Sequence, residues 1–313
     1  MRKNEGKVEN YTRVSEFVVV GFPSLQSEYF HLVAWFFFVL YVTTVVGNVL
    51  LVMAFALERS LQKTPKYIAV FNLAFTDLFG SSALVPKVLD IFLFDHPYIS
   101  YNDCLTFMFF CYACLPMQAL NLVILAYDRL IAVSFPLHYH MKVTHRFMFS
   151  LIASFWFFII IVVLIAVVLL TRLSYCKSVV IDSYFCDYVL MQKLACNDRT
   201  AIQVFGNFLP VLILWLPLVF IVFTYMYIGS ALTKVATVRE RVKAFKTCIA
   251  HVSLVAIYFL PIIITFTISI HPNYRIINLS LSSVIPPTLN PIIYVLQTQE
   301  IKESVKNLLK TRG

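Results

Sequence analysis

The chain has 313 residues, of which 60% are hydrophobic and 13% are charged, and its formal net charge is +9. Ordinary soluble domains contain about 25% charged residues, so this chain would have too little polar surface to cover itself in water. The composition excludes a soluble globular protein and indicates one that crosses the membrane several times. The first ten residues are polar and the first apolar run is too long for a signal peptide, so we expect no cleaved leader.

Seven apolar stretches are each long enough to cross a bilayer as a helix, which needs about 20 residues. In chain order they are 29–57, 66–93, 104–134, 146–170, 203–231, 244–270 and 276–297. The expected fold is therefore an all-α membrane protein, a seven-transmembrane helix bundle over 29–297. Residues 1–28 precede it as an N-terminal tail, and the longest connection, 171–202, is polar and rich in cysteine.

The positively charged residues orient this bundle. More than half of the 25 lysines and arginines lie beside the span ends that share a side with the C-terminus. Because Lys and Arg concentrate in cytoplasmic loops, the N-terminus is expected to be extracellular. The triplet Asn10-Tyr11-Thr12 agrees, since it makes Asn10 a candidate glycosylation site. A similar triplet at Asn278 lies in or beside a span, and we interpret it as a chance match.

Asp77 lies in the middle of the second span, where an ionisable group is costly and therefore a candidate functional residue. The competing interpretation is a protonated acid that is satisfied by neighbours on its own helix. Asn48 from the first span and Asn290 from the seventh could face Asp77 and form a polar centre. Lys87 and Asp90 lie near the outer end of the second span, where long side chains can reach water.

The third span carries residues that recur at steps of three, four and seven, and so share one helix face. They are Cys104, Cys111, Leu115, Gln118, Leu122, Leu125 and Arg129. This face runs from the outer loop to the acid–base pair Asp128-Arg129 at the inner end. It could transmit a change between the two sides of the membrane, or be an ordinary packing face, and the spacing is compatible with both.

The cysteines fall into two groups. Cys104 opens the third span, and Cys176, Cys186 and Cys196 lie in the long outer loop. Four cysteines in an oxidising compartment permit three pairings, and the residues alone leave all three open. The remaining cysteines fall inside spans and are expected to stay reduced: Cys111, Cys114 and Cys248.

The last spans and the C-terminal segment carry further signals. Prolines inside spans are expected to kink their helices, which suits a rearrangement between two states: Pro217, Pro261 and Pro291. Residues 298–313 are expected to form a short cytoplasmic amphipathic helix and tail on the membrane surface. Its apolar residues recur at helical spacing among lysines: Ile301, Val305, Leu308 and Leu309.

Taken in order, several motifs resemble the landmarks of a rhodopsin-like (class A) G-protein-coupled receptor. They are Gly47-Asn48, "LAFTD" ending at Asp77, Asp128-Arg129, Trp156, Pro217, Tyr225, Pro261 and "NPIIY" from Asn290 to Tyr294. Within that class, "TPKYIAVFNLAFTD", "AYDRLIAVSFPLHYH", "KAFKTCIAH" and "PPTLNPIIY" are similar to odorant (olfactory) receptors over essentially the whole chain. The resemblance implies a plasma-membrane receptor, not an enzyme, that binds a small-molecule odorant and activates a heterotrimeric G protein of the stimulatory olfactory type. It implies no cofactor and no metal.

The resemblance also implies roles for particular residues. It pairs the loop cysteines as Cys104–Cys186 and Cys176–Cys196. Asp128 is expected to hold Arg129 in the resting bundle. The release of Arg129 is then expected to open a groove for the G protein. The expected switch and G-protein-coupling residues are Asp77, Asp128, Arg129, Tyr225, Asn290, Pro291 and Tyr294.

The same resemblance places the ligand between the helices in the outer half of the bundle, in a mostly apolar pocket. The expected lining residues are Cys111, Tyr112, Leu115, Tyr188, Leu209, Ile213, Phe259, Ile262, Phe266, Ser280 and Ser283. None of them is charged near neutral pH, and burial of an unpaired ion is costly, so a neutral, semi-apolar odorant is expected. The alternative is that a loop charge enters the pocket: Asp187, Lys193, His271 or Arg275.

Some positions depart from the common patterns. Leu130 replaces the usual aromatic residue after the arginine, and Phe259 stands where most class A receptors have a tryptophan. Gln118 stands where many odorant receptors have a glutamate, which predicts weak sodium binding near Asp77. Cys111 stands where amine receptors have an aspartate, and Val284 stands where opsins have the lysine that forms a Schiff base. A non-olfactory class A receptor for another small molecule remains the alternative, whereas a transporter would be expected to show inverted repeats.

Overall fold

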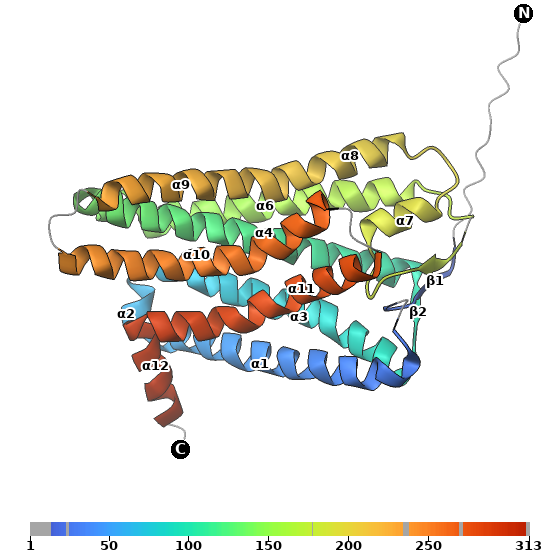
Figure 1. Cartoon of the computed structure of the whole chain (residues 1–313), viewed down its shortest axis with the longest axis horizontal. Helices are drawn as coiled ribbons and strands as arrows, with labels where there is room; N and C mark the ends of the chain where they lie inside the picture. The colour runs from blue at the N-terminus through green and yellow to red at the C-terminus, as the bar shows by residue number, and fades with distance from the viewer. Residues whose placement is uncertain (1–13, 23–24, 177, 234–237, 269–271, 311–313) are drawn as a thin grey trace, which may run out of the picture.

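The computed structural model describes residues 14–22, 25–176, 178–233, 238–268 and 272–310. In this part of the chain, seven helices are long and apolar enough to cross a membrane, and they run side by side as an elongated bundle (Figure 1). Six spans are α1 Phe30–Leu57, α3 Lys66–Phe94, α4 Tyr101–Ser134, α6 His145–Thr171, α10 Val238–Thr267 and α11 Pro272–Gln297. The remaining span consists of α8 Thr200–Pro210, the π-helical turn η3 Val211–Trp215 and α9 Leu216–Leu232.

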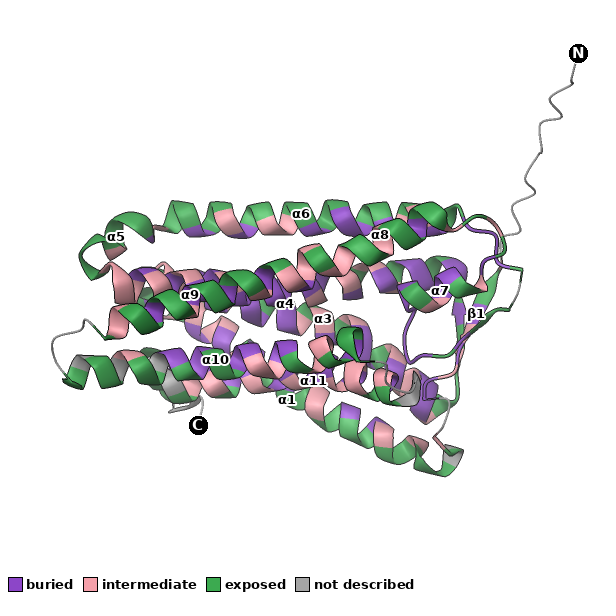
Figure 2. Ribbon diagram, turned by 45° about the horizontal axis from the view of Figure 1, so that its top comes forward, coloured by how far each residue is buried: buried purple, intermediate pink, exposed green. Residues whose placement is uncertain are grey.

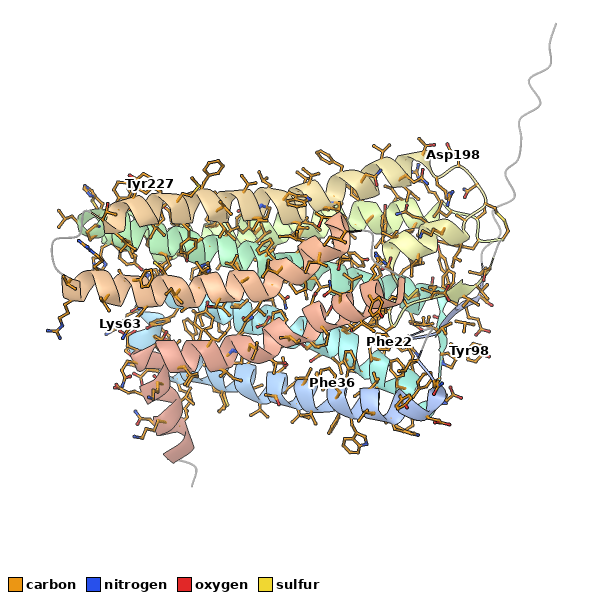
Figure 3. All side chains as sticks on the ribbon, in the orientation of Figure 1. Phe22, Phe36, Lys63, Tyr98, Asp198 and Tyr227 are labelled. Carbon is orange, nitrogen blue, oxygen red and sulfur yellow. A yellow bond between two sulfur atoms is a disulfide. The ribbon has the colours of Figure 1, made fainter. Side chains whose placement is uncertain are left out.

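Short elements distinguish the two ends of the bundle (Figure 1). One end carries β1 Glu16–Val19, η1 Ser27–Tyr29, β2 Tyr98–Ser100, β3 Val180–Ile181 and α7 Tyr188–Leu194, and we call it the sheet end. The other end carries α2 Arg59–Gln62, η2 Pro136–His138, α5 Tyr139–Lys142 and α12 Gln299–Lys310, and we call it the α12 end. The charged residues Lys63 and Asp198 mark the opposite ends in Figure 3.

The apolar stretches locate the spans, but several helices extend beyond them. The third span begins at Tyr101 instead of 104, because Ser100 caps the helix by accepting a 3.1 Å hydrogen bond from the backbone N–H of Asp103. The fifth begins at Thr200 instead of 203, and the seventh at Pro272 instead of 276. The sixth runs over Val238–Thr267 instead of 244–270. At the third span a polar capping residue sets where the helix begins, whereas hydropathy reports only the apolar part of a helix.

The outer surface of the bundle is apolar. Many residues of α6, α8 and α9 are exposed, while α4 is largely buried among its neighbours (Figure 2). Trp35, Phe157 and Phe223 are among the large apolar side chains that remain exposed on different helices. Such a surface is unfavourable in water and suits the hydrocarbon of a bilayer.

The N-terminal segment contributes a strand to a small sheet at the sheet end. The strand order is β2-β1-β3, with β1 antiparallel to β2 and parallel to β3. Phe17 of β1 is fully buried, and its ring packs edge-on against Tyr175 at a centroid distance of 5.2 Å. Part of the segment expected as a tail is therefore a strand. The candidate glycosylation site Asn10 lies outside the described residues.

Two disulfides are formed at the sheet end. Cys104, in the first turn of α4, is joined to Cys186 of the long connection, and Cys176 is joined to Cys196 within that connection. The first bond attaches the connection to α4, and the second closes the connection on itself. The other cysteines are free and buried: Cys111, Cys114 and Cys248.

The C-terminal helix α12 is amphipathic, and its apolar face packs against protein. Ile301 and Val305 are buried and belong to the main hydrophobic core of the bundle. The helix contacts α1 and α11. The sequence predicted an amphipathic helix here that lies on the membrane surface. The helix is present, and spacing alone could not show that Ile301 and Val305 also pack against the bundle. The side chain of Leu309 lies outside the described residues.

Candidate functional site

A cavity of about 160 Å³ lies between the helices towards the sheet end. Its volume is close to that of an apolar protein cavity, about 150 Å³, that binds one small aromatic molecule. Most of the expected ligand-binding residues line it: Tyr112, Leu115, Tyr188, Leu209, Ile213, Ile262, Phe266 and Ser283. The cavity thus brings together side chains from α4, α7, α8, η3, α10 and α11.

Three expected residues do not line this cavity. Cys111 and Phe259 are buried in hydrophobic clusters, and Ser280 is buried with its hydroxyl donating a 2.7 Å hydrogen bond to the carbonyl of Ile277. Tyr258 lines the cavity in place of Phe259. Because a helix turns by about 100° per residue, an error of one position moves a side chain to another face.

Residues 184–189 of the long connection form one wall of the cavity, and we call them the lid. Cys186 attaches the lid to α4 through its disulfide with Cys104. The hydroxyl groups of Tyr184 and Ser283 lie 3.3 Å apart, which links the lid to α11. The lid is therefore anchored on two helices that line the cavity.

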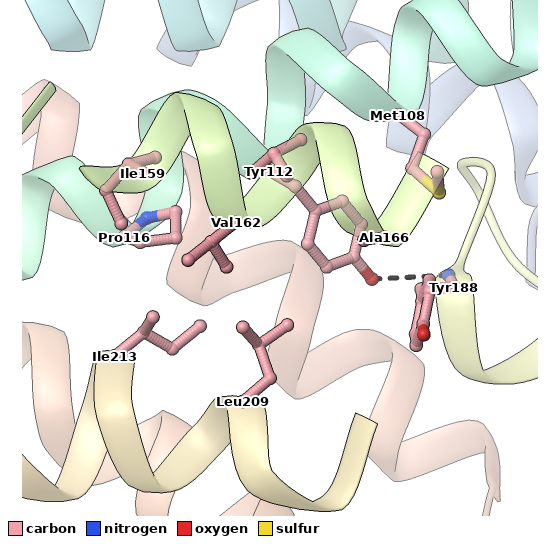
Figure 4. Close-up of a pocket in the computed structure, with 10 residues that line it drawn as sticks. Met108, Tyr112, Pro116, Ile159, Val162, Ala166, Tyr188, Leu209 and Ile213 are labelled. Carbon is pink, nitrogen blue, oxygen red and sulfur yellow. Dashed lines mark hydrogen bonds between the residues drawn. The ribbon is translucent and has the colours of Figure 1, made fainter. Parts of the chain in front are cut away.

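Tyr188 adds two further anchors to the lid. Its backbone N–H donates a 3.3 Å hydrogen bond to the hydroxyl of Tyr112 on α4 (Figure 4). Its own hydroxyl donates to the carbonyl of Ile202 on α8, also at 3.3 Å. Burial raises the pKa of Tyr188 to about 12, so this hydroxyl stays protonated near neutral pH and remains a donor.

A second hollow, of about 10 Å³, adjoins the cavity (Figure 4). Tyr112, Pro116, Tyr188, Leu209 and Ile213 line both spaces. The remaining wall of the second hollow is apolar and comes from α4 and α6: Met108, Ile159, Val162, Val163 and Ala166. This hollow has room for little more than one water molecule, so the larger cavity is the candidate ligand site.

The π-helical turn shapes one wall of the cavity. Leu209, Pro210, Ile213 and Leu214 line it, from the end of α8 through η3. Proline has no backbone N–H to donate, and π-helical turns often occur at functional sites. Pro217 is the proline in this span that was expected to kink the helix. Pro210 was the signal that could have predicted the altered turn.

Two charged residues also line the cavity. Asp187 of the lid and Arg275 of α11 approach each other to 3.8 Å, carboxylate Oδ2 to guanidinium nitrogen. The lining residues expected from the resemblance are all uncharged, whereas the cavity wall also includes Asp187 and Arg275, two of the four charged residues named as the alternative. The exposed Lys193 does not line the cavity, and His271 lies outside the described residues.

A polar centre lies deeper in the bundle. Asp77 on α3 is fully buried, and its two carboxylate oxygens each accept a hydrogen bond from an amide. Gln118 on α4 donates to Oδ1 at 2.9 Å, and Asn290 on α11 donates to Oδ2 at 2.8 Å. Asn48, which the sequence suggested as another partner, donates instead to the carbonyl oxygens of Thr44 and Pro287.

A neighbouring hydrogen-bond network links three helices and was not predicted from the sequence. Asn72 on α3 donates a 2.6 Å hydrogen bond to Asn121 on α4 and accepts one of 3.0 Å from the indole N–H of Trp156 on α6. Asn121 in turn donates to Thr76 at 3.2 Å. Amides and an indole inside apolar spans were the available signals, because buried polar groups in membranes find partners.

Other expected switch residues lie nearer the α12 end. Asp128 is buried and lies 3.7 Å from the guanidinium of Arg129. The Tyr225 hydroxyl and Nδ1 of His251 are 2.6 Å apart, which joins α9 to α10. The side chain of Tyr294 is buried, and no hydrogen-bond partner for its hydroxyl lies in the described part of the chain.

Among the described residues, no group of three His, Cys, Asp or Glu side chains is placed to hold a metal ion. The arrangement consists of a cavity towards one end, a polar centre in the middle and an ion pair near the other end. Such an arrangement can bind a small molecule and couple its binding to a rearrangement of helices.

Comparisons with known proteins agree on the family and the fold. A family model described as "Olfactory receptor" matches residues 37–312. The chain is 33% identical over 303 residues to olfactory receptor 1F1 of Homo sapiens, and the match covers 96% of both chains. It is 32% identical over 304 residues to olfactory receptor 1468 of Rattus norvegicus, again covering 96% of both. The crystal structure of squid rhodopsin shares the fold, with a TM-score of 0.72 at 17% identity over 92% of this chain and 87% of that chain.

Proposed function

The chain belongs to the olfactory receptor family, and from this premise we propose that it binds a neutral, semi-apolar odorant in the cavity beside the lid and activates a heterotrimeric G protein of the stimulatory olfactory type. The family and the seven-helix fold make it a multi-pass membrane receptor that signals and has no catalytic role. The observation that supports the ligand site is the cavity itself, because most of the residues expected from the family position line it.

The chemistry of the cavity wall supports a neutral ligand. Most side chains that line the cavity are apolar. The two charged side chains in the wall, Asp187 and Arg275, face each other, and their opposite charges compensate each other. The hydroxyl groups of Tyr112, Ser282 and Ser283 supply a few polar partners. A ligand with an apolar body and one or two hydrogen-bonding groups fits such a wall, whereas an ion would be buried without a free partner of opposite charge.

The orientation is proposed from charge and redox chemistry. The sheet end, with its two disulfides, suits an extracellular, oxidising environment, and the α12 end, with most of the basic residues, suits the cytoplasm. Residues 1–28 are then extracellular, 29–297 form the bundle in the plasma membrane, and 298–313 are cytoplasmic. The basic α12 end would also attract anionic lipid and partner surfaces.

The proposed signal passes along α4. Tyr112 and Leu115, which line the cavity, precede Gln118 on this helix, and Gln118 donates a hydrogen bond to Asp77. The same helix carries Asp128 and Arg129 near its C-terminal end. A change in helix packing at the cavity could therefore alter the polar centre and the ion pair. Release of Arg129 would then expose a binding groove for the G protein.

The test is a cell assay with a cyclic-nucleotide reporter and a broad panel of neutral odorants, amines and carboxylates. We expect responses to neutral compounds. Arg129→Ala should abolish the response while surface expression and odorant binding persist. A receptor that answers only charged compounds, or that loses odorant binding in Arg129→Ala at normal surface expression, would contradict the proposal.

A further inference from the structure

The ion pair in the cavity joins two segments that are far apart in the sequence. Asp187 comes from the lid, directly after the disulfide-bonded Cys186, and Arg275 comes from the beginning of α11. The carboxylate side chain is 3% exposed and the guanidinium side chain is 24% exposed. Both side chains line the cavity, so any ligand inside it experiences both charges.

The Asp187 carboxylate is held by the helix that follows it. Its Oδ1 accepts hydrogen bonds of 2.8 Å and 3.0 Å from the backbone N–H groups of Val189 and Leu190, and so caps α7. Its Oδ2 faces Arg275. The acid is held in place by the helix that it caps, independently of the arginine.

Arg275 is held less closely. Its nitrogen lies 3.8 Å from Asp187, beyond the usual hydrogen-bond range of about 2.7–3.2 Å. In the described part of the chain, Asp187 carries the only carboxylate within ion-pair distance of this guanidinium. A guanidinium has five N–H donors in a planar fork that matches a carboxylate. The charge of Arg275 is thus compensated by Asp187, while its donors remain available to a ligand.

We propose that Asp187 determines the charge selectivity of the cavity: by compensating Arg275, it prevents the arginine from selecting carboxylate ligands and keeps the site selective for neutral ones. This inference rests on the proposed ligand function of the cavity and deepens it. A carboxylate that binds Arg275 in the native receptor must approach the buried anion of Asp187, and the site then holds two anions and one cation. A neutral carbonyl or hydroxyl group can accept a hydrogen bond from Arg275 without that penalty.

Removal of the Asp187 charge should therefore change the preference of the site from neutral ligands to carboxylates. Asp187→Asn retains the side-chain oxygen that caps α7, since Asn and Asp are equally good capping residues, but it leaves Arg275 without an anionic partner. A ligand carboxylate can then supply the missing charge through a charge-assisted hydrogen bond, while the apolar wall contacts its alkyl chain. We expect the affinity for alkyl carboxylates to rise by about tenfold or more, and the affinity for matched aldehydes to change much less.

The experiment measures binding to the full-length receptor, purified in detergent, by ligand-induced shifts in its thermal unfolding. The probes are straight-chain carboxylates from butanoate to octanoate and the aldehydes of the same length. Asp187→Asn should gain carboxylate binding, and the double variant Asp187→Asn with Arg275→Gln should lose that gain. Asp187→Ser, which also caps a helix and has no charge, replaces Asp187→Asn if the latter does not fold.

Asp198→Asn is the matched control, because it makes the same chemical change in the same long connection at an exposed carboxylate that binds Thr200. It should leave the binding of carboxylates and aldehydes unchanged. The proposal is wrong if Asp187→Asn and Asp187→Ser gain no carboxylate binding over the native receptor, or if the gain persists without Arg275. Because this assay needs no G protein, a receptor that shows the switch but no cyclic-nucleotide response to odorants would support the selectivity proposal and count against the proposed signalling function.

Discussion

Tyr139 of α5 donates a 2.7 Å hydrogen bond to the buried carboxylate of Asp128 on α4. The neighbouring guanidinium of Arg129 approaches that carboxylate only to 3.7 Å. Burial, and then the charge of Asp128, raise the pKa of Tyr139 above its ordinary value, so the phenol stays protonated and remains a donor. The acid that the sequence paired with Arg129 is therefore also bound to the loop that follows α4.

This contact predicts that Tyr139→Phe raises signalling in the absence of ligand. The change removes a hydrogen bond to a charged group, worth roughly 1.5–3 kcal/mol, and leaves Asp128 less well held in the resting state. We expect basal reporter activity to rise by about fivefold or more, which corresponds to about 1 kcal/mol of coupling. Tyr227→Phe, at an exposed tyrosine on α9 near the same end (Figure 3), is the control and should change nothing. Unchanged or lower basal activity in Tyr139→Phe would count against a resting-state role.

Gly47 of α1 should not tolerate alanine. A Cβ at this position would lie 2.7 Å from Cγ of Pro291 on α11, and a proline ring is fixed to its backbone and cannot turn aside. Overpacking of this kind costs about 1–3 kcal/mol. We expect a lower unfolding temperature and lower surface expression. Gly229→Ala is the matched control, because a Cβ there meets nothing within 4 Å and alanine favours a helix by up to about 1 kcal/mol. Equal effects of the two changes would refute the close-approach explanation.

The two phenylalanines of α10 that were expected in the pocket should behave differently. Phe266 lines the cavity, so Phe266→Ala should weaken the odorant response by about tenfold through lost apolar contact, at normal surface expression. Phe259 is 1% exposed in the core, so Phe259→Ala should destabilise the receptor by about 3–5 kcal/mol. Dose–response curves and surface labelling of both variants test this difference. A loss of response in Phe259→Ala at normal surface expression would contradict this difference and indicate that Phe259 contacts the ligand.

Sodium should have little effect on the native receptor. Both oxygens of Asp77 already accept hydrogen bonds from amides, and the amide of Gln118 adds no second negative charge. Exchange of sodium for choline should shift ligand potency by less than about twofold. Gln118→Glu would place a second acid beside Asp77 and should create a saturable sodium dependence. A large sodium effect in the native receptor that vanished in Asp77→Asn would disprove the prediction.

The sequence by itself determined the number of spans, the seven-helix fold and the family. Apolar runs of membrane length are local features, and a spanning helix satisfies its own backbone hydrogen bonds, so no distant segment is needed to define it. The family motifs are likewise contiguous stretches, such as "NPIIY" from Asn290 to Tyr294. Asp77 and Asn290 could be proposed as neighbours because each is a costly polar residue in an apolar span, and the structure brings them to 2.8 Å.

The tertiary structure alone decided which of the expected side chains reach the cavity and which charged residues join them. Position in a family pattern selected Phe259, but the rotation of α10 brings Tyr258 to the cavity wall instead. The pairing of Asp187 with Arg275 depends on a disulfide that fixes the lid and on the place where α11 begins, and neither residue carries a local signal of the other. From the sequence, a charged residue in a loop is expected to face water. Only the fold shows that it is buried beside a partner of opposite charge. The electrostatic character of the ligand site therefore follows from packing between distant segments, which hydropathy and spacing do not encode.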